Sequence, residues 1–139
     1  IVWVGYREMI VLDTHVWIWW VSDPGLVSAD ARKLMQRSIK NESVHISCIS
    51  SWEVAMLAGR GRLQLTMPVE DWVEKSEALS FFNFVPVTNS IALKSVYLPA
   101  PFHSDPADRI IVATAIAMGA TLVTKDQKIL GYPYVKTSW

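Results

Sequence analysis

Four acidic residues lie far apart in the sequence but at similar places relative to its apolar runs. Asp13 directly follows the apolar run 9–12, and Glu53 comes shortly after a second run that ends near residue 49. Asp108 precedes a long apolar stretch, and Asp126 follows another short run. Carboxylates gathered in one place repel one another unless a cation lies between them, and oxygen ligands select Mg²⁺ or Mn²⁺. These residue types therefore indicate divalent-metal chemistry.

The other metal-binding side chains do not indicate zinc. Zinc prefers histidine or cysteine at ligand spacing, whereas the three histidines and the single cysteine of this chain are scattered along it. A magnesium ion on a rim of carboxylates suits phosphate chemistry, because it positions a phosphodiester, activates water and neutralises charge on the leaving oxygen.

The elements that must position the acids alternate along the chain. We predict strands at 9–12, 44–49, 84–87 and 121–124, a short fifth strand at 134–135, and helices at 14–21, 28–40, 50–58, 68–79, 90–97 and 106–118. Such alternation predicts parallel pairing through right-handed crossovers. The expected fold class is α/β, a three-layer α/β/α sandwich around a mainly parallel sheet of four to five strands.

This architecture brings the acids to one edge of the sheet. A crossover helix runs antiparallel to its strand, so its first turn lies at the carboxyl edge, where open α/β folds build their sites. Each acid alone is also explained as a helix cap: 50–53 reads as a capping box, and Asp105 reads as the N-cap of the helix 106–118. Surface caps should scatter over both edges, however, so the four together favour a shared site.

Composition sets the remaining bounds. The 139 residues predict one domain, and the 13 basic and 13 acidic side chains give no net charge. Setting aside the four acids leaves a basic surplus, which is compatible with a nucleic-acid substrate. Arg109 and Lys125 adjoin proposed ligands and are candidates for contact with RNA phosphate.

The single cysteine excludes an internal disulfide, so we expect a cytoplasmic protein. No run is long enough for a membrane span, and Met9 suggests that 1–8 is an N-terminal extension to a domain at 9–139.

Four segments carry a resemblance to a known family. MIVLDTHVWIWW, ISSWEVAMLAGRGRL, HSDPADRIIVATA and LVTKDQKI, in this order, resemble the acidic motifs of PIN-domain ribonucleases, and most of all the VapC toxins of toxin–antitoxin pairs. The resemblance implies a PIN-like α/β/α sandwich and an endoribonuclease dependent on Mg²⁺ or Mn²⁺. It also implies a homodimer and a cognate antitoxin that blocks the site.

The resemblance assigns roles by position. Asp13, Glu53, Asp108 and Asp126 match the four acids that hold the metal and catalyse hydrolysis by a metal-activated water. Asp105 is an additional acid of the HxDPxDR variant, which we interpret as the helix cap. Two threonines beside the acids, Thr14 and Thr124, are expected to orient the ligands or a water.

Other functions fit less well. A phosphoacceptor receiver domain needs an acidic pair after the first strand and an aspartate that ends the third, but NFVPVTN contains no acid. An aspartate-nucleophile phosphatase needs D-x-D where this chain has DTH. The alternative that remains is a non-catalytic protein-binding module, whose acids are helix caps and whose interface is the tryptophan-rich segment VWIWWV.

Overall fold

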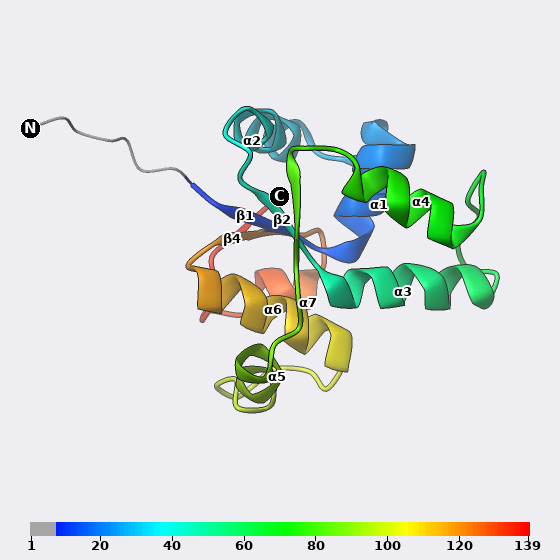
Figure 1. Ribbon diagram of the computed structural model, residues 1–139. Helices are drawn as coiled ribbons and strands as arrows, with labels where there is room; N and C mark the ends of the chain where they lie inside the picture. Colours follow the sequence, from blue (N-terminus) through cyan, green and yellow to red (C-terminus); the bar gives the residue numbers. More distant parts are fainter. Residues whose placement is uncertain (1–7) are drawn as a thin grey trace, which may run out of the picture.

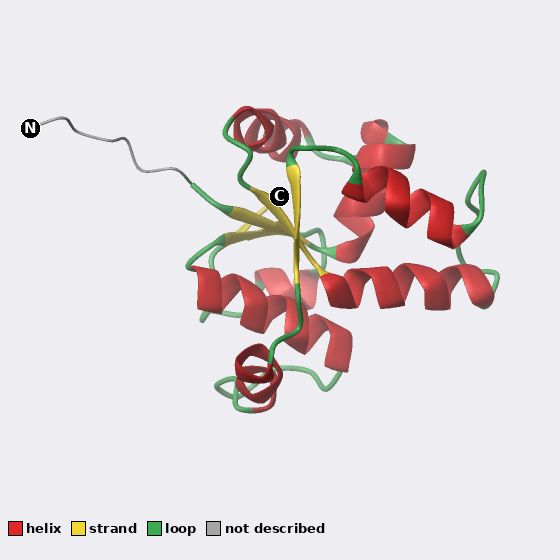
Figure 2. Cartoon of the chain, viewed as in Figure 1, coloured by secondary structure: helices red, strands yellow, loops and turns green. Residues whose placement is uncertain are grey.

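The computed structural model describes residues 8–139, which form a five-stranded sheet covered by helices on both faces (Figures 1 and 2). All neighbouring strands pair in parallel, in the order β3-β2-β1-β4-β5. The strands are β1 (Ile10–Leu12), β2 (Val44–Ser47), β3 (Phe82–Val85), β4 (Thr121–Val123) and β5 (Thr137–Ser138). The predicted α/β/α sandwich with a parallel sheet is therefore confirmed. The predicted extension at 1–8 lies outside the described residues, apart from Glu8.

Seven α-helices occur among the described residues. They are α1 (Thr14–Ser22), α2 (Ala29–Lys40), α3 (Cys48–Gly59), α4 (Val69–Glu77), α5 (Asn89–Val96), α6 (Pro106–Met118) and α7 (Gln127–Leu130), with a short 3₁₀ turn at Pro24–Leu26. Within the described part of the chain, no helix has both the length and the apolar character needed to cross a membrane.

The central strand divides the hydrophobic core into two halves. Successive side chains of a strand point to opposite faces, so Ile10 and Leu12 pack with α1, α2 and α4, whereas Val11 packs with α5, α6 and α7. All three side chains are fully buried. The chain runs outward from β1 to β2 and β3, and then returns to β4 on the other side of β1. The strand order thus reverses between β1 and β4, the place where α/β sheets open a crevice at their carboxyl edge.

Helix α6 has the predicted bounds and is packed on more than one side. It begins after Asp105, whose side chain accepts a hydrogen bond from the backbone N–H of Asp108, and it ends at Gly119 with φ 63°. Glycine adopts this left-handed conformation without steric strain. The interior residues Ile111, Val112 and Ala113 are fully buried. The helix is therefore a rigid support for the acidic residues at its start.

Several predicted boundaries are wrong. Helix α3 starts at Cys48, because Ser47 is its N-cap and accepts a hydrogen bond from the N–H of Ile49 at 3.2 Å. Strand β3 lies two residues earlier than predicted, and Pro86, which has no N–H for a ladder, follows it directly. The fifth strand is at 137–138 and not at 134–135, because Thr137 and Ser138 are the residues that pair in register with β4. The four-residue helix α7 was not predicted.

Candidate active site

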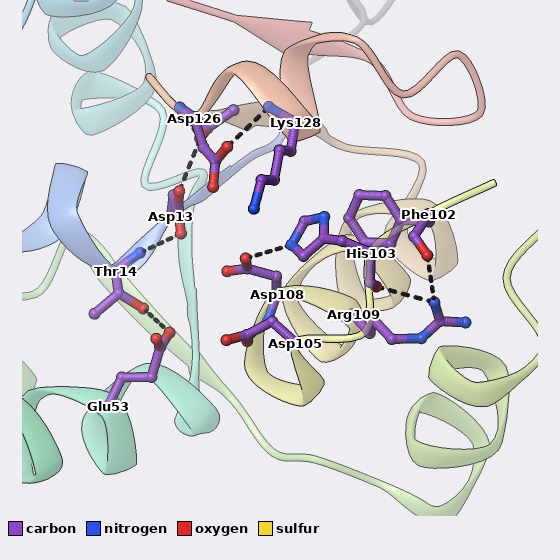
Figure 3. A network of polar contacts seen from close by, with 11 residues as sticks. Asp13, Thr14, Glu53, Phe102, His103, Asp105, Asp108, Arg109, Asp126 and Lys128 are labelled. Carbon is purple, nitrogen blue, oxygen red and sulfur yellow. Dashed lines mark hydrogen bonds and ion pairs between the residues drawn. The ribbon is translucent and has the colours of Figure 1, made fainter. Parts of the chain in front are cut away.

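All four predicted acids line one cavity of about 560 Å³ at the carboxyl edge of the sheet. Asp13 lies between β1 and α1, Glu53 in α3, Asp108 in the first turn of α6, and Asp126 just before α7. Asp105, His15, Val16, Trp19 and Lys125 complete the lining. Four segments that are distant in sequence therefore bring carboxylates to one hollow, as the strand order requires (Figure 3).

Asp13 is the most buried of the four acids, with 8% of its surface exposed. Its Oδ1 accepts a hydrogen bond from the N–H of Thr14 at 2.8 Å, and its Oδ2 accepts one from Oγ1 of Thr124 at 2.7 Å. Burial raises the pKa of Asp13, and these two hydrogen bonds oppose that effect without cancelling it. The side chain therefore has a fixed orientation in a setting that disfavours an isolated negative charge.

Glu53 reaches from α3 toward the start of α1. Its Oε1 accepts a hydrogen bond from Oγ1 of Thr14 at 2.6 Å, and the hydroxyl of Ser50 lies 2.8 Å from the same Thr14 oxygen. Because Thr14 has one hydroxyl proton, Ser50 serves as donor to Thr14 while Thr14 donates to the carboxylate. Burial is the main cause that raises the pKa of Glu53 to about 7. The capping-box interpretation of Glu53 is wrong, since Ser47 caps this helix.

Asp108 is held by a histidine. Nε2 of His103 lies 2.6 Å from Oδ2 of Asp108, and both side chains are largely buried. Burial raises the pKa of Asp108, and the hydrogen bond from His103 lowers it by less. Asp105 is exposed and uses its Oδ1 to accept from the N–H of Asp108 at 3.0 Å, so its predicted role as helix cap is confirmed.

Asp126 combines a cap with a place in the cavity. Its Oδ1 accepts a hydrogen bond from the N–H of Lys128 at 2.8 Å, at the start of α7. Its own N–H donates to Oγ1 of Thr124 at 3.0 Å, and the same hydroxyl donates to Asp13. Thr124 therefore joins two of the acids, and helix capping and site formation are compatible uses of one carboxylate.

The donor set fits a hard divalent cation. One oxygen each of Glu53, Asp108 and Asp126 accepts the hydrogen bonds described above, and no residue in 8–139 donates to the other. Ligand atoms of His103, Asp108 and Asp126 lie within 4.8 Å of one another. A divalent cation among these groups would offset the crowding of negative charge that acts with burial to raise the pKa values of Glu53 and Asp108.

The two predicted phosphate contacts differ in their settings. The Lys125 side chain lines the cavity, and its Nζ lies 5.8 Å from the centre of the Trp19 indole ring. The guanidinium of Arg109 instead donates to the backbone carbonyls of Ser95, Val96, Phe102 and His103 at 2.8–3.4 Å. Figure 3 shows this group turned away from the acids. Its geometry favours a structural role, so its contact with phosphate stays a prediction.

Three polar or aromatic side chains at the site were not predicted to lie there. His103, His15 and Trp19 lie at or beside the cavity. The spacing of the histidines does not match a zinc site, so the sequence gives them no ligand role. The position of His103, two residues before the N-cap of α6, was the available signal, since a side chain there lies next to the first turn of the helix.

Comparisons with known proteins point to one family. The family model for the PIN domain matches residues 10–133. The chain is 36% identical to "Ribonuclease VapC22" of Mycobacterium tuberculosis, over 94% of this chain and 98% of that protein. A toxin–antitoxin complex from Klebsiella pneumoniae contains a chain with TM-score 0.63 and 25% identity, over 94% of this chain and 98% of that one. A VapBC2 complex from Rickettsia felis, bound to a promoter DNA fragment, gives TM-score 0.70 at 16% identity, again over 94% and 98%, and supports the fold alone.

The family model covers most of the chain, and the curated relative is 36% identical over 94% of it. Each of these matches is sufficient to establish the family. The acids predicted from the sequence all lie within residues 10–133, the part that the family model covers. The chain belongs to the PIN-domain family and, within it, to the VapC-type ribonucleases.

Proposed function

We propose that this chain is the toxin of a toxin–antitoxin pair and acts in the cytoplasm as an endoribonuclease that depends on Mg²⁺ or Mn²⁺. The observation that carries the proposal is that four carboxylates, from four separate segments, line one cavity. Three of them, Glu53, Asp108 and Asp126, each have one oxygen that accepts no hydrogen bond from residues 8–139. In this proposal 9–139 is the nuclease domain and 1–8 is an extension to it.

Asp13, Glu53, Asp108 and Asp126 would hold the ion. Such an ion, when bound, lowers the pKa of water and offsets negative charge on the phosphodiester. The protein's own part is to keep the ligands in place. Thr14 donates its backbone N–H to the Asp13 carboxylate and its hydroxyl to the Glu53 carboxylate. The buried Thr124 hydroxyl donates to Asp13 and accepts a hydrogen bond from the N–H of Asp126.

The rest of the cavity suits an RNA substrate. Lys125 supplies a positive charge for a phosphate, and Trp19 supplies an aromatic face on which a base can stack. The four acids would repel a polyanion without a cation, so we expect RNA to bind weakly to the metal-free protein. Binding of a labelled, uncleavable RNA analogue should therefore increase on addition of Mg²⁺.

The partners are proposed from the relatives. Because the solved relative from Klebsiella pneumoniae is a toxin–antitoxin complex, we propose a cognate antitoxin that covers the cavity of this chain. We also propose a homodimer, as expected for this family. Light scattering of the purified protein tests the dimer, and protection of RNA on addition of the product of an adjacent small gene tests the antitoxin.

RNA cleavage tests the function itself. The purified protein should cut RNA in Mg²⁺ or Mn²⁺, and EDTA, Asp13→Asn or Asp108→Asn should abolish the cleavage. Cleavage that persists equally in both variants would come from a contaminant. A well-folded protein that binds neither metal nor RNA would instead support the alternative, a non-catalytic binding module with capping acids.

A further inference from the structure

His103 lies in the loop that leads into α6, beside one acid of the proposed metal site. Its Nε2 is 2.6 Å from Oδ2 of Asp108, and Figure 3 shows the imidazole facing that carboxylate. The histidine therefore adjoins a proposed ligand, and two roles are open to it: it either binds the cation itself or holds Asp108.

The imidazole is held firmly by its neighbours. Its ring centre lies 4.3 Å from that of Phe102, and the Phe102 ring lies 4.5 Å from that of Tyr132. The backbone carbonyl of His103 accepts a hydrogen bond from Nη1 of Arg109 at 3.2 Å. A side chain packed in this way is well suited to fix the orientation of another group.

The other ring nitrogen decides between the two roles. Nδ1 of His103 is buried, and nothing within residues 8–139 forms a hydrogen bond with it. A proton on Nδ1 would bury a donor without an acceptor, and it would leave the lone pair of Nε2 facing the Asp108 carboxylate. A proton on Nε2 instead gives a short hydrogen bond to Asp108 and places only a lone pair in the buried position.

A ligand role needs a different arrangement. A histidine that binds a metal almost always donates its second ring N–H to a carboxylate, a carbonyl or water. Its Nε2 is near Asp108 and Asp126, with ligand atoms within 4.8 Å of one another, but its buried Nδ1 lacks such an acceptor among the described residues. Proximity alone therefore does not make His103 a ligand.

We propose that His103 is a positioning residue, whose Nε2–H holds Oδ2 of Asp108 and leaves Oδ1 available to the cation. This inference rests on the proposed function, because it assigns the role of Asp108 in metal binding. It gives His103 the same part toward Asp108 that Thr14 has toward Glu53 and Thr124 toward Asp13.

Metal affinity separates this role from a purely structural one. We would titrate Mn²⁺ into the wild type, His103→Leu, His103→Gln and the control His45→Gln, whose site on β2 is outside the cavity, and follow binding by calorimetry. His103→Leu should weaken Mn²⁺ binding by about 10- to 100-fold, the usual effect of losing such a partner. His103→Gln keeps a nitrogen donor at a similar distance and should restore most of the affinity, while His45→Gln should bind as the wild type does.

Nitrogen NMR of the ring tests the proton position directly. In ¹⁵N-labelled protein, the His103 signals, identified by their loss in His103→Gln, should report a proton on Nε2, both without metal and with Mg²⁺. A proton on Nδ1 in the Mg²⁺-loaded protein would overturn the inference in favour of a ligand.

The failures of the two proposals are distinguishable. Equal Mn²⁺ affinity of the wild type and His103→Leu would refute the role of His103 and leave the metal-dependent function standing. A wild type that binds no Mn²⁺ would refute the proposed function, and this inference with it.

Discussion

Glu53→Gln should stabilise the metal-free protein at neutral pH. Burial raises the pKa of Glu53 from 4.5 to about 7, with smaller contributions from the nearby carboxylates of Asp108, Asp13 and Asp105. Glutamine has the same shape and no charge, and its Oε1 can still accept the hydrogen bond that Thr14 donates at 2.6 Å. The substitution therefore removes the unfavourable charge and keeps the contact.

The sign of the pH dependence follows from which state binds the proton more tightly. Between pH 4.5 and about 7 the folded protein holds a proton on Glu53 that the unfolded chain releases. The contribution of Glu53 to the free energy of unfolding is therefore present at acidic pH and is lost as pH rises through this window. A pKa difference of this size corresponds to about 3 kcal/mol, and solvent screening of the half-buried side chain reduces it to about 1–2 kcal/mol.

Urea unfolding in EDTA at several pH values measures this effect. Near pH 4.5 the wild type and Glu53→Gln should have equal free energies of unfolding, whereas at about pH 7.5 the variant should be more stable by about 1–2 kcal/mol. Glu74→Gln, an exposed position on α4, is the matched control and should change little at either pH. A variant that is less stable than the wild type at pH 7.5 would refute the reasoning and make Glu53 a structural residue.

Further predictions concern the groups around the acids. Thr124→Val should lower the free energy of unfolding by about 1–3 kcal/mol in urea, because it removes a fully buried hydroxyl that hydrogen-bonds Asp13; unchanged stability would contradict the network. Asp105→Asn should keep both the Mn²⁺ affinity and the stability of the wild type, since asparagine caps a helix as well as aspartate does. Asp105→Ala should lower the free energy of unfolding by about 1 kcal/mol. A large loss of affinity in Asp105→Asn would make this residue a ligand. Arg109→Leu should destabilise the protein by about 2–4 kcal/mol, because it leaves several carbonyls without donors. A variant that is as stable as the wild type but fails to bind RNA would instead support a contact between Arg109 and phosphate.

The gathering of the four acids at the carboxyl edge of the sheet could be predicted, because strand order and helix direction follow from simple patterns in the sequence. Asp13 follows an apolar run directly, Asp126 comes three residues after the end of β4, and Asp105 and Gly119 mark the two ends of α6. Local signals of this kind act within a few residues, so they are readable without tertiary information. The convergence of the acids then follows from parallel pairing alone.

Features that depend on tertiary contacts were not predicted correctly. Ser47, Cys48 and Ile49 read as the end of a strand, yet Ser47 caps a helix there, which frees Ser50 and Glu53 to meet Thr14 across the site. Two serines three residues apart offer equivalent caps on paper, and packing decides between them.

Strand position and side-chain pairing escaped prediction for the same reason. The sequence pattern predicts the fifth strand at 134–135, but parallel register with β4 selects Thr137 and Ser138. The pairing of His103 with Asp108 depends on how the loop folds back on α6, and a lone histidine carries no spacing pattern that reveals such a contact.

The most direct test is an anomalous diffraction measurement on crystals grown with Mn²⁺. The anomalous difference map should contain a peak in the cavity, within coordination distance of carboxylate oxygens of Asp13, Glu53, Asp108 and Asp126 or of waters that they hold. A map with no peak there, or with manganese only at unrelated surface carboxylates, would contradict the claim that these four segments fold to bind one divalent centre.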